Sequence, residues 1–286
     1  MFSLKIENSK GSIIELTNNE EEFQVTKIEG LNPPNATINT SIYANGDGSS
    51  FNSSRIPNRE IVLTIYINGD VEKNRLILYK YFRSKEWCKI YYKNNSRNVY
   101  IEGYVQTLEV SPFTQKQVAQ ISILCPNPYF KDLETIIKSI SKELACFTFP
   151  FSINIDNPIE ISSIQLEKIT NIINESESET GLIIDIKFMG TIKKLEIRNV
   201  NNGESFIIDY KFIKNDKLLI NCNRGNKSVT LTRDAVEYNL IPFVESGSTF
   251  FQLEIGDNNF SFLADNGSND MLVDIHFKYY KVYLGV

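Results

Sequence analysis

Hydrophobic and polar residues alternate along most of the chain, and this two-residue period is that of a β-strand with one buried face. In the first half the alternation predicts four strands, at 60–67, 89–93, 99–105 and 118–125. The second and third strands pair across the turn at 94–98, and Pro126 ends the fourth. The first half is therefore predicted to be a β-sheet domain.

One segment of the first half has a helical period instead. Asp70 is a favourable N-cap for a helix, and Leu76, Tyr79 and Phe82 follow it at helical spacing. We predict a helix at about 71–84. Because it joins two strands, we expect it to pack across an open face of the sheet.

The second half of the chain consists of short alternating segments separated by turn signals, with no helical stretch of any length. This pattern predicts an antiparallel β-sandwich. Between the halves, mixed charges and an aromatic run at 147–151 indicate a connector. We therefore predict an N-terminal β domain at 1–130, a connector at 131–150 and a C-terminal sandwich at 151–286.

The composition suits a globular protein of two domains. The chain has 286 residues, with 30 Lys and Arg against 35 Asp and Glu, a net charge of −5. This acidic balance argues against nucleic acid as the main ligand, because phosphate binding needs a basic face. The N-terminus has no apolar run of secretory length, and no stretch approaches the roughly 18 apolar residues of a membrane span. We expect a soluble protein made in the cytoplasm, without membrane insertion.

The four cysteines are scattered along the chain and form no CxxC pair. They are Cys88, Cys125, Cys146 and Cys222. Structural zinc needs clustered ligands, and a disulfide framework needs more cysteines per residue. We therefore expect four buried thiols.

The single histidine, His276, limits the catalytic options. Beside Asp274 it could act as a general base. Its alternation with Ile275 and Phe277, however, is typical of an ordinary strand histidine, and we favour that interpretation.

Other candidate chemistry is equally weak. A glycosidase needs two acids facing a cleft, whereas the carboxylates here lie mostly in turns and at strand ends. Segments 45–49 and 265–270 are rich in oxygen ligands but lack the spacing of a calcium loop, so we predict plain turns. The sequence predicts no catalytic residue, no cofactor and no metal.

The segment 32–56 is unusual because it is long, polar and rich in Asn, Ser and Gly. A polar segment of this length inside a compact domain is usually functional or pairs with a partner chain. We interpret it as a loop that contacts other subunits. The candidate contact residues are Asn32, Asn45, Gly46, Asp47, Gly48, Arg55 and Arg59.

One ordered set of motifs runs through the first half of the chain: Gly30, the polar loop with 45–48, 59–65, Gly69-Asp70, Arg75-Leu76 with Phe82, 101–105 and 121–130. This set resembles the distal tail protein family of siphovirus-type phages, the adaptor at the tip of long phage tails. Within the last motif, the residues Cys125, Pro126, Pro128 and Tyr129 are interpreted as closing the domain. Second-half segments also fit the family, namely Asp209, 218–222, 227–231, 239–241, 247–253 and 256–258.

The resemblance implies a fold and a function. The fold would be mainly β, with a split-barrel-like N-terminal domain carrying one helix, followed by a galectin-like antiparallel β-sandwich. The function would be structural: a ring, usually of six copies, between the tail tube and the tail-tip hub, the tail-associated lysin or the receptor-binding protein. The polar loop and the sheet edges would supply subunit contacts. The protein would be a virion component, synthesised in the cytoplasm of a host bacterium.

Two alternatives from other classes stay open at this point. One is a carbohydrate-binding module that contacts a host glycan, with Tyr and Phe residues of the second domain as a stacking platform. The other is the non-catalytic N-terminal part of a tail-associated lysin or hub, against which the end of the chain at Val286 weighs. An adaptor from a contractile tail, a prophage or a phage-like bacteriocin is not separable by sequence.

Overall fold

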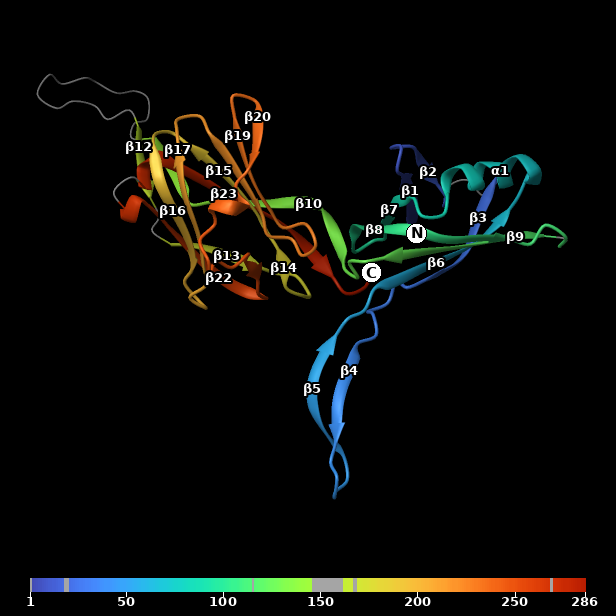
Figure 1. Cartoon of the computed structure of the whole chain (residues 1–286). Helices are drawn as coiled ribbons and strands as arrows, with labels where there is room; N and C mark the ends of the chain where they lie inside the picture. Colours follow the sequence, from blue (N-terminus) through green and yellow to red (C-terminus); the bar gives the residue numbers. More distant parts are fainter. Residues whose placement is uncertain (1, 18–20, 115, 146–161, 167–168, 268–269) are drawn as a thin grey trace, which may run out of the picture. The chain divides into compact units, whose positions relative to one another are not determined.

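The computed structural model describes residues 2–17, 21–114, 116–145, 162–166, 169–267 and 270–286. The chain divides into two compact units (Figure 1). Unit 1 comprises Met1–Leu133 together with Val282–Val286, and unit 2 comprises Glu134–Lys281. Residues 282–286, which the sequence places in the second domain, pack within the first unit.

Unit 1 is built on an open antiparallel sheet with the order β2-β1-β7-β8-β9-β6-β3. Its strands are β1 (Ser3–Asn8), β2 (Ile13–Glu15), β3 (Phe23–Glu29), β6 (Arg59–Ile67), β7 (Trp87–Lys93), β8 (Asn98–Val110) and β9 (Gln117–Cys125). These strands confirm the four predicted ones. The sheet does not close into a barrel in the described part of the chain, since β2 and β3 form its two edges.

The helix α1 (Val71–Tyr81) connects β6 to β7 and confirms the predicted helix, although it is shorter at its end. The Asp70 side chain accepts a hydrogen bond from the Lys73 amide at 3.2 Å and so caps the first turn. Leu78 and Phe82 are buried in the core of the unit with the apolar faces of the strands. The helix therefore anchors itself to the sheet through these two side chains.

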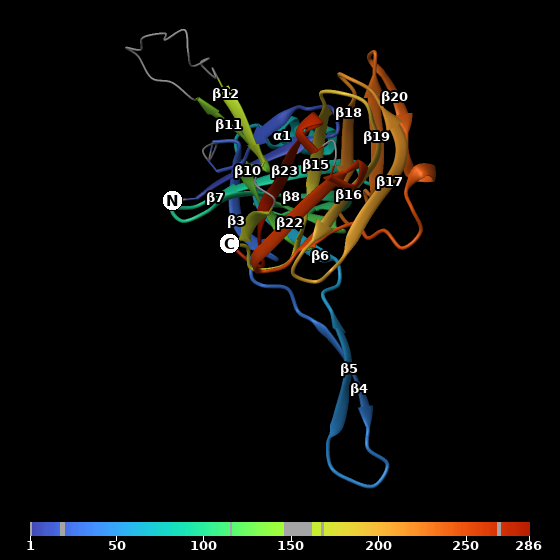
Figure 2. The same ribbon diagram turned by 90° about the vertical axis from the view of Figure 1, so that its left-hand side faces the viewer.

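The polar segment between β3 and β6 is not a loop. It forms a two-stranded antiparallel hairpin, β4 (Thr37–Ile42) and β5 (Ser49–Arg55), that extends away from the rest of unit 1 (Figures 1 and 2). Thr, Ile and Phe favour strands, but neither strand alternates between buried and exposed positions. The hairpin therefore lacks the pattern by which a strand is recognised in sequence.

Unit 2 is an antiparallel sandwich, as the second half of the chain predicts. One sheet has the order β23-β15-β18-β19-β20 and the other β13-β22-β16-β17. The first comprises β15 (Ile183–Phe188), β18 (Lys217–Asn221), β19 (Ser228–Arg233), β20 (Val236–Asn239) and β23 (Val273–Tyr283). The second comprises β13 (Thr170–Asn174), β16 (Ile192–Asn199), β17 (Ser205–Phe212) and β22 (Gly256–Ala264).

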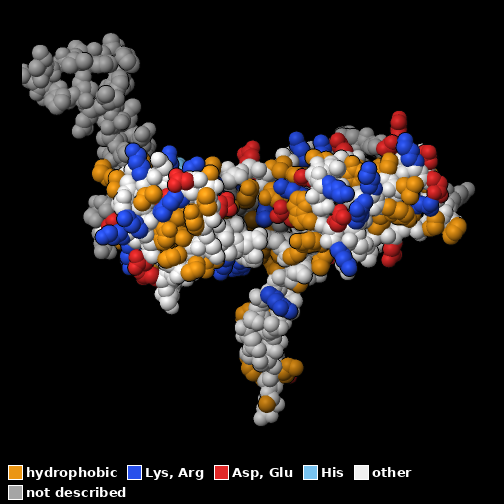
Figure 3. Space-filling model, turned by 45° about the horizontal axis from the view of Figure 1, so that its top comes forward, with side chains coloured by type: hydrophobic (Ala, Val, Ile, Leu, Met, Phe, Trp, Pro, Cys, Tyr) orange, Lys and Arg blue, Asp and Glu red, His pale blue; other side chains and the backbone are white. Residues whose placement is uncertain are grey.

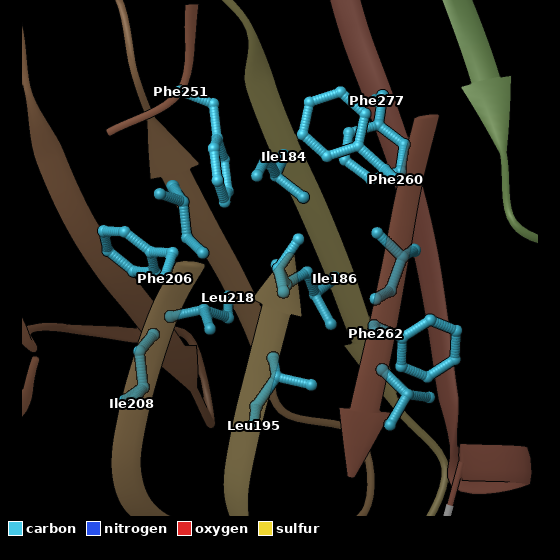
Figure 4. Packing of buried hydrophobic residues seen from close by; sticks show 14 of the residues in the cluster. Ile184, Ile186, Leu195, Phe206, Ile208, Leu218, Phe251, Phe260, Phe262 and Phe277 are labelled. Carbon is cyan, nitrogen blue, oxygen red and sulfur yellow. The ribbon is translucent and has the colours of Figure 1, made fainter. Parts of the chain in front are cut away.

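The inner faces of the two sheets form one aromatic-rich core. Phe206, Phe251, Phe260 and Phe277 meet between the sheets together with branched aliphatic side chains (Figure 4). Their rings pack at tilted or edge-on angles, the arrangement that ring quadrupoles favour. Most of the second-domain Phe residues, which were candidates for a sugar-stacking platform, are therefore buried in the core.

The remaining elements complete the described part of the chain, and most of them are short. They are β10 (Phe130–Ser139), β11 (Ser141–Ala145), β12 (Ser162–Leu166), β14 (Thr180–Gly181), β21 (Gln252–Leu253) and the 3₁₀ turns Ile241–Phe243, Asp265–Gly267 and Asp270–Leu272. The segment 131–150, expected to be a connector, therefore holds two strands over its described part. The aromatic run at 147–151 lies outside the described residues.

Candidate assembly interface

The β4–β5 hairpin is exposed on both faces and nearly free of charge. Its large side chains stand in solvent, with Ile42 85% exposed and Phe51 66% exposed. Between residues 32 and 58 the only charged residues are Asp47 and Arg55. The visible face of the hairpin is accordingly mostly uncharged, with hydrophobic side chains toward its outer part (Figure 3).

The strands of the hairpin are joined by side chains as well as by backbone. Asn39 Nδ2 donates to Ser53 Oγ at 2.9 Å, and Asn52 Nδ2 donates to Ser41 Oγ at 2.6 Å. These cross-strand bonds keep the pair in register although it has no hydrophobic core beneath it.

The predicted contact residues Asn45, Gly46, Asp47 and Gly48 form the turn at the tip of the hairpin. Gly48 has φ +94°, a conformation that glycine adopts without strain. Asn32, Arg55 and Arg59 lie at the opposite end. We call this end the hairpin root and define it as residues 30–36 and 55–60.

The root is organised by Arg59, whose residue is only 3% exposed. Its Nε donates to the Pro128 carbonyl at 2.6 Å, and its Nη1 donates to the Asn32 carbonyl at 2.9 Å and to the Gly30 carbonyl. Its Nη2 donates to the Leu284 carbonyl. One guanidinium therefore joins three separate segments of unit 1.

The positive charge of Arg59 is stabilised by the dipoles of the backbone carbonyls that it contacts and by the face of the Phe130 ring. Its Cζ lies 4.7 Å from the centre of the Phe130 ring, a cation–π distance. Burial lowers the pKa of the guanidinium, and the neighbouring Cys125 sulfur opposes that shift. The fork of five N–H donors explains why arginine serves here, since lysine offers only one ammonium point charge.

The predicted domain-closing residues lie beside this arginine. Cys125 ends β9 opposite Arg59 on β6, and its side chain is fully buried. Pro126 and Pro128 turn the chain, so that the Pro128 carbonyl faces the Arg59 fork. The Tyr129 amide donates to Asn127 Oδ1 at 3.1 Å and stabilises the turn. The structure thus brings Cys125, Pro128 and Arg59 together.

A hollow of about 420 Å³ opens at the root. Its walls are Gly30, Asn32, Pro33, Pro34, Asn35, Pro57, Asn58, Arg59 and Glu60. The prolines fix the backbone where the chain enters and leaves the hairpin. This end of the hairpin is therefore rigidly shaped, while its outer part has no support from unit 1.

The other chemical candidates behave as strand and turn residues. His276 lies on β23, with Nε2 3.1 Å from Asp274 Oδ2. Asp265, from the segment compared with calcium loops, accepts the amides of Lys193 and Lys194 at 2.9 Å each. Over the described residues, no group of three or more His, Cys, Asp or Glu side chains could hold a metal ion.

The expected buried thiols are found where the chain is described. Cys88, Cys125 and Cys222 are free and buried, and burial raises the pKa of each thiol to about 12. Cys146 lies outside the described residues. No helix among the described segments is long and apolar enough to cross a membrane.

Several residues of this region are not predictable from the sequence alone. Ile42 and Phe51 lie in a segment whose polar composition predicts a loop, so the sequence does not single them out. Arg97 and the segment 282–286 were missed because their partners are distant in the sequence. Large hydrophobic residues are nevertheless a local signal, since they are unusual within so polar a segment, and the exposed ones are Ile38, Ile42, Tyr43 and Phe51.

Comparison with known families gives two matches in succession. Residues 9–125 match the phage tail protein RIFT-related domain, and residues 175–282 match the C-terminal domain of the siphovirus-type tail component. Together they cover most of both units. Among curated protein sequences, none is similar enough to the chain to count as a match.

Solved structures show the same fold over the whole length. The Dit protein of phage SPP1, described as a paradigm of the hub adsorption apparatus in phages that infect Gram-positive hosts, has a TM-score of 0.68 at 11% identity. Two structures of the phage p2 baseplate in its activated conformation, with Ca and with Sr, give TM-scores of 0.58 and 0.59 at 12% and 13% identity. Each alignment covers 98% of both chains.

Proposed function

The chain belongs to the siphovirus-type distal tail protein family, a family of structural virion proteins, and we propose that it forms a ring in which the β4–β5 hairpin binds a neighbouring copy. The ring would join the tail tube to the tail-tip hub or tail-associated lysin, as the family resemblance implies, and six copies are the expected number. It would work by assembly and not by catalysis. The observation that carries this proposal is the hairpin.

The hairpin needs a partner on energetic grounds. A single two-stranded hairpin is marginally stable in water, because it buries too little apolar surface to offset the ordering of its backbone. Here neither face is covered by unit 1, yet the hairpin presents large apolar side chains to solvent. A neighbouring copy that covered them would supply the missing burial.

Ile42 and Phe51 are the proposed anchors. Phe51 lies opposite Thr40 in the register, and Ile42 follows Thr40 by two residues on the same strand. The two side chains are therefore diagonal neighbours on one face of the hairpin. Aromatic and aliphatic anchors of this kind carry much of the binding energy in protein interfaces.

A hairpin that binds a different surface of the next copy makes a head-to-tail contact. Such heterologous contacts close into a ring when the rotation between copies allows it. The near absence of charge on the hairpin removes the cost of burying an unpaired ion in this contact. The nearly uncharged hairpin has few side chains suited to catalysis, and this agrees with a role in assembly.

The test is the mass of the assembly. Wild-type protein is expected to form rings in light scattering and negative-stain images, whereas the double variant Ile42→Ser/Phe51→Ser stays monomeric at the same concentration. A matched control is Ile173→Ser, which changes a half-exposed isoleucine on β13 of unit 2 and should leave the ring intact. A wild-type protein that is monomeric at high concentration contradicts the proposal, as does an unchanged ring in the double variant.

A further inference from the structure

The last five residues of the sequence lie against the hairpin root. The segment 282–286, which we call the strap, continues from strand β23 and belongs to unit 1. Val282 and Gly285 are buried, while Tyr283 and Val286 pack against the core of the unit. The strap is thus an integral part of unit 1 although the rest of β23 lies in unit 2.

The strap is held along its length by polar contacts. Tyr283 Oη donates to Asp132 Oδ2 at 3.1 Å. The Leu284 carbonyl accepts from Arg59, and the Gly285 carbonyl accepts from Arg97 Nη1. The Val286 amide donates to the Leu31 carbonyl at 3.0 Å.

Gly285 fits its place only because it has no side chain. A Cβ there would come within 2.9 Å of Pro33 Cδ and within 3.0 Å of the Leu31 carbonyl and the Pro33 nitrogen. Two of these atoms are backbone and the third belongs to a rigid ring, so they cannot move aside cheaply. The strap therefore lies directly against the chain that leads into β4.

Arg59 connects the strap to the root. The same guanidinium that binds the Leu284 carbonyl also binds the carbonyls of Gly30 and Asn32. Charge-assisted bonds to one rigid fork hold their acceptors in a defined geometry. Loss of the strap would leave part of the fork unpaired inside the protein, which is costly.

We propose that the strap fixes the hairpin root, with Arg59 and Arg97 as positioning residues, so that the direction of the hairpin depends on a segment more than 220 residues away in the sequence. Arg59 then serves assembly through the backbone it orders. Its side chain is buried within unit 1, so the proposed role is to position the root. The strap proposal concerns unit 1 alone, and only its consequence for assembly rests on the proposed ring.

Hydrogen exchange of the full chain, measured by mass spectrometry, tests the proposal. In Gly285→Val the peptides that cover the root are expected to exchange on the order of tenfold faster, because local opening becomes easier. Peptides from β8, β9 and unit 2 should be unchanged. Arg97→Ala should act in the same direction with a smaller effect, since Arg59 still holds the Leu284 carbonyl.

Two controls match these variants. Gly46→Val introduces the same side chain at the hairpin tip, where nothing lies within 4 Å, and Arg83→Ala removes a half-exposed arginine of the same unit. Both should leave root exchange at the wild-type rate. Root protection that persists although the strap itself exchanges fully would overturn the proposal. Acceleration spread evenly over unit 1 would also overturn it, because it indicates general destabilisation.

Ring formation by the same variants gives a separate readout. If the wild type forms rings and Gly285→Val does not, while its unit 2 keeps the wild-type exchange rate, the strap supports assembly as proposed. If the wild type forms no ring, the proposed function fails. Hydrogen exchange of the root peptides still tests the proposal that the strap fixes the root.

Discussion

Unit 2 and the hairpin of unit 1 are both made of antiparallel strands, but they use their side chains in opposite ways. In unit 2 every second residue of the main strands enters an aromatic core, as in β16 and β22. In the hairpin almost every residue is exposed. Strands that bury one face in a core therefore show alternation, whereas strands exposed on both faces do not.

The two units also differ in charge. Unit 1 carries 15 Lys and Arg against 14 Asp and Glu, while unit 2 carries 15 against 21. The acidic excess of the chain thus belongs to unit 2. A nearly neutral unit 1 is suited to repeated contacts between identical copies, since like charges repel across an interface.

The largest expected effect comes from opening the core of unit 2. Phe260 is fully buried, with its ring centre 5.2 Å from that of Phe251 and 5.1 Å from that of Phe277. Phe260→Ala should lower the free energy of unfolding of unit 2 by about 3–5 kcal/mol, through lost burial and the cavity left behind. Calorimetry should show a lower melting temperature for the transition of unit 2 and an unchanged one for the transition of unit 1. Phe243→Ala, at a half-exposed position, is the control. An equal shift of both transitions would contradict the prediction that Phe260 stabilises only the core of unit 2.

A smaller effect is expected from crowding the core of unit 1. A Cβ at Gly103 would lie 2.8 Å from Cys125 Sγ, Ile123 Cγ2 and the Leu124 carbonyl oxygen. Gly103→Ala should destabilise unit 1 by about 1–3 kcal/mol, as overpacking usually does. Gly46→Ala meets no atom within 4 Å and should leave the denaturation midpoint unchanged. A wild-type midpoint for Gly103→Ala would show that the strands β8 and β9 can separate without cost.

Alkaline pH should weaken unit 1 more than unit 2. The folded pKa of each buried thiol is raised to about 12, so the stabilisation is complete below the ordinary value of 9.0 and is lost between pH 9 and 12. At pH 10 each thiol should cost about 1 kcal/mol relative to pH 8. Among the described residues, unit 1 contains the buried thiols of Cys88 and Cys125, and unit 2 contains that of Cys222. Tyr91 of unit 1, with its pKa raised to about 12, and Tyr279 of unit 2, whose pKa is also raised by burial, act in the same direction.

Calorimetric scans at pH 8 and pH 10 check this difference. The unit 1 transition should fall further than that of unit 2, and Cys125→Ala should reduce the pH dependence of unit 1 only. Equal shifts of the two transitions would count against the buried thiols as the cause.

The smallest effect on stability is expected in the hairpin. Phe51 is mostly exposed in the single chain, so Phe51→Ser should change the unfolding free energy of unit 1 by less than about 0.5 kcal/mol. Its effect on ring formation should be large by comparison. A strong loss of stability in the monomer would show that the hairpin is part of the core, and would remove the contrast with unit 2.

Local patterns were sufficient for the regular elements. The strands of the first half and the sandwich of the second half are predicted by the two-residue period of β-strands. The helix is predicted by its helical period and by the N-cap Asp70. The buried thiols followed from their spacing. The motifs of the first half indicated the family, because their order along the chain is more specific than any one of them.

The candidate site was only partly predictable. The sequence singled out the segment 32–56 and Arg59, but not the hairpin or the partners of the arginine. The hairpin was missed because alternation arises from burial on one face, and this hairpin is buried on neither. The contacts of Arg59 were missed because they reach Gly30, Pro128 and Leu284, which are far apart in sequence.

The sequence alone therefore determined the β-rich class, the two-domain plan, the helix α1 and the family, since each depends on neighbouring residues or on the order of motifs. The tertiary structure decided that residues 282–286 belong to unit 1, that Arg59 is buried among backbone carbonyls and that the polar segment stands out as a hairpin. These features depend on contacts between distant segments, and no local period records them. Hydrogen bonds to main-chain carbonyls leave no signature in the side chains of the residues that accept them.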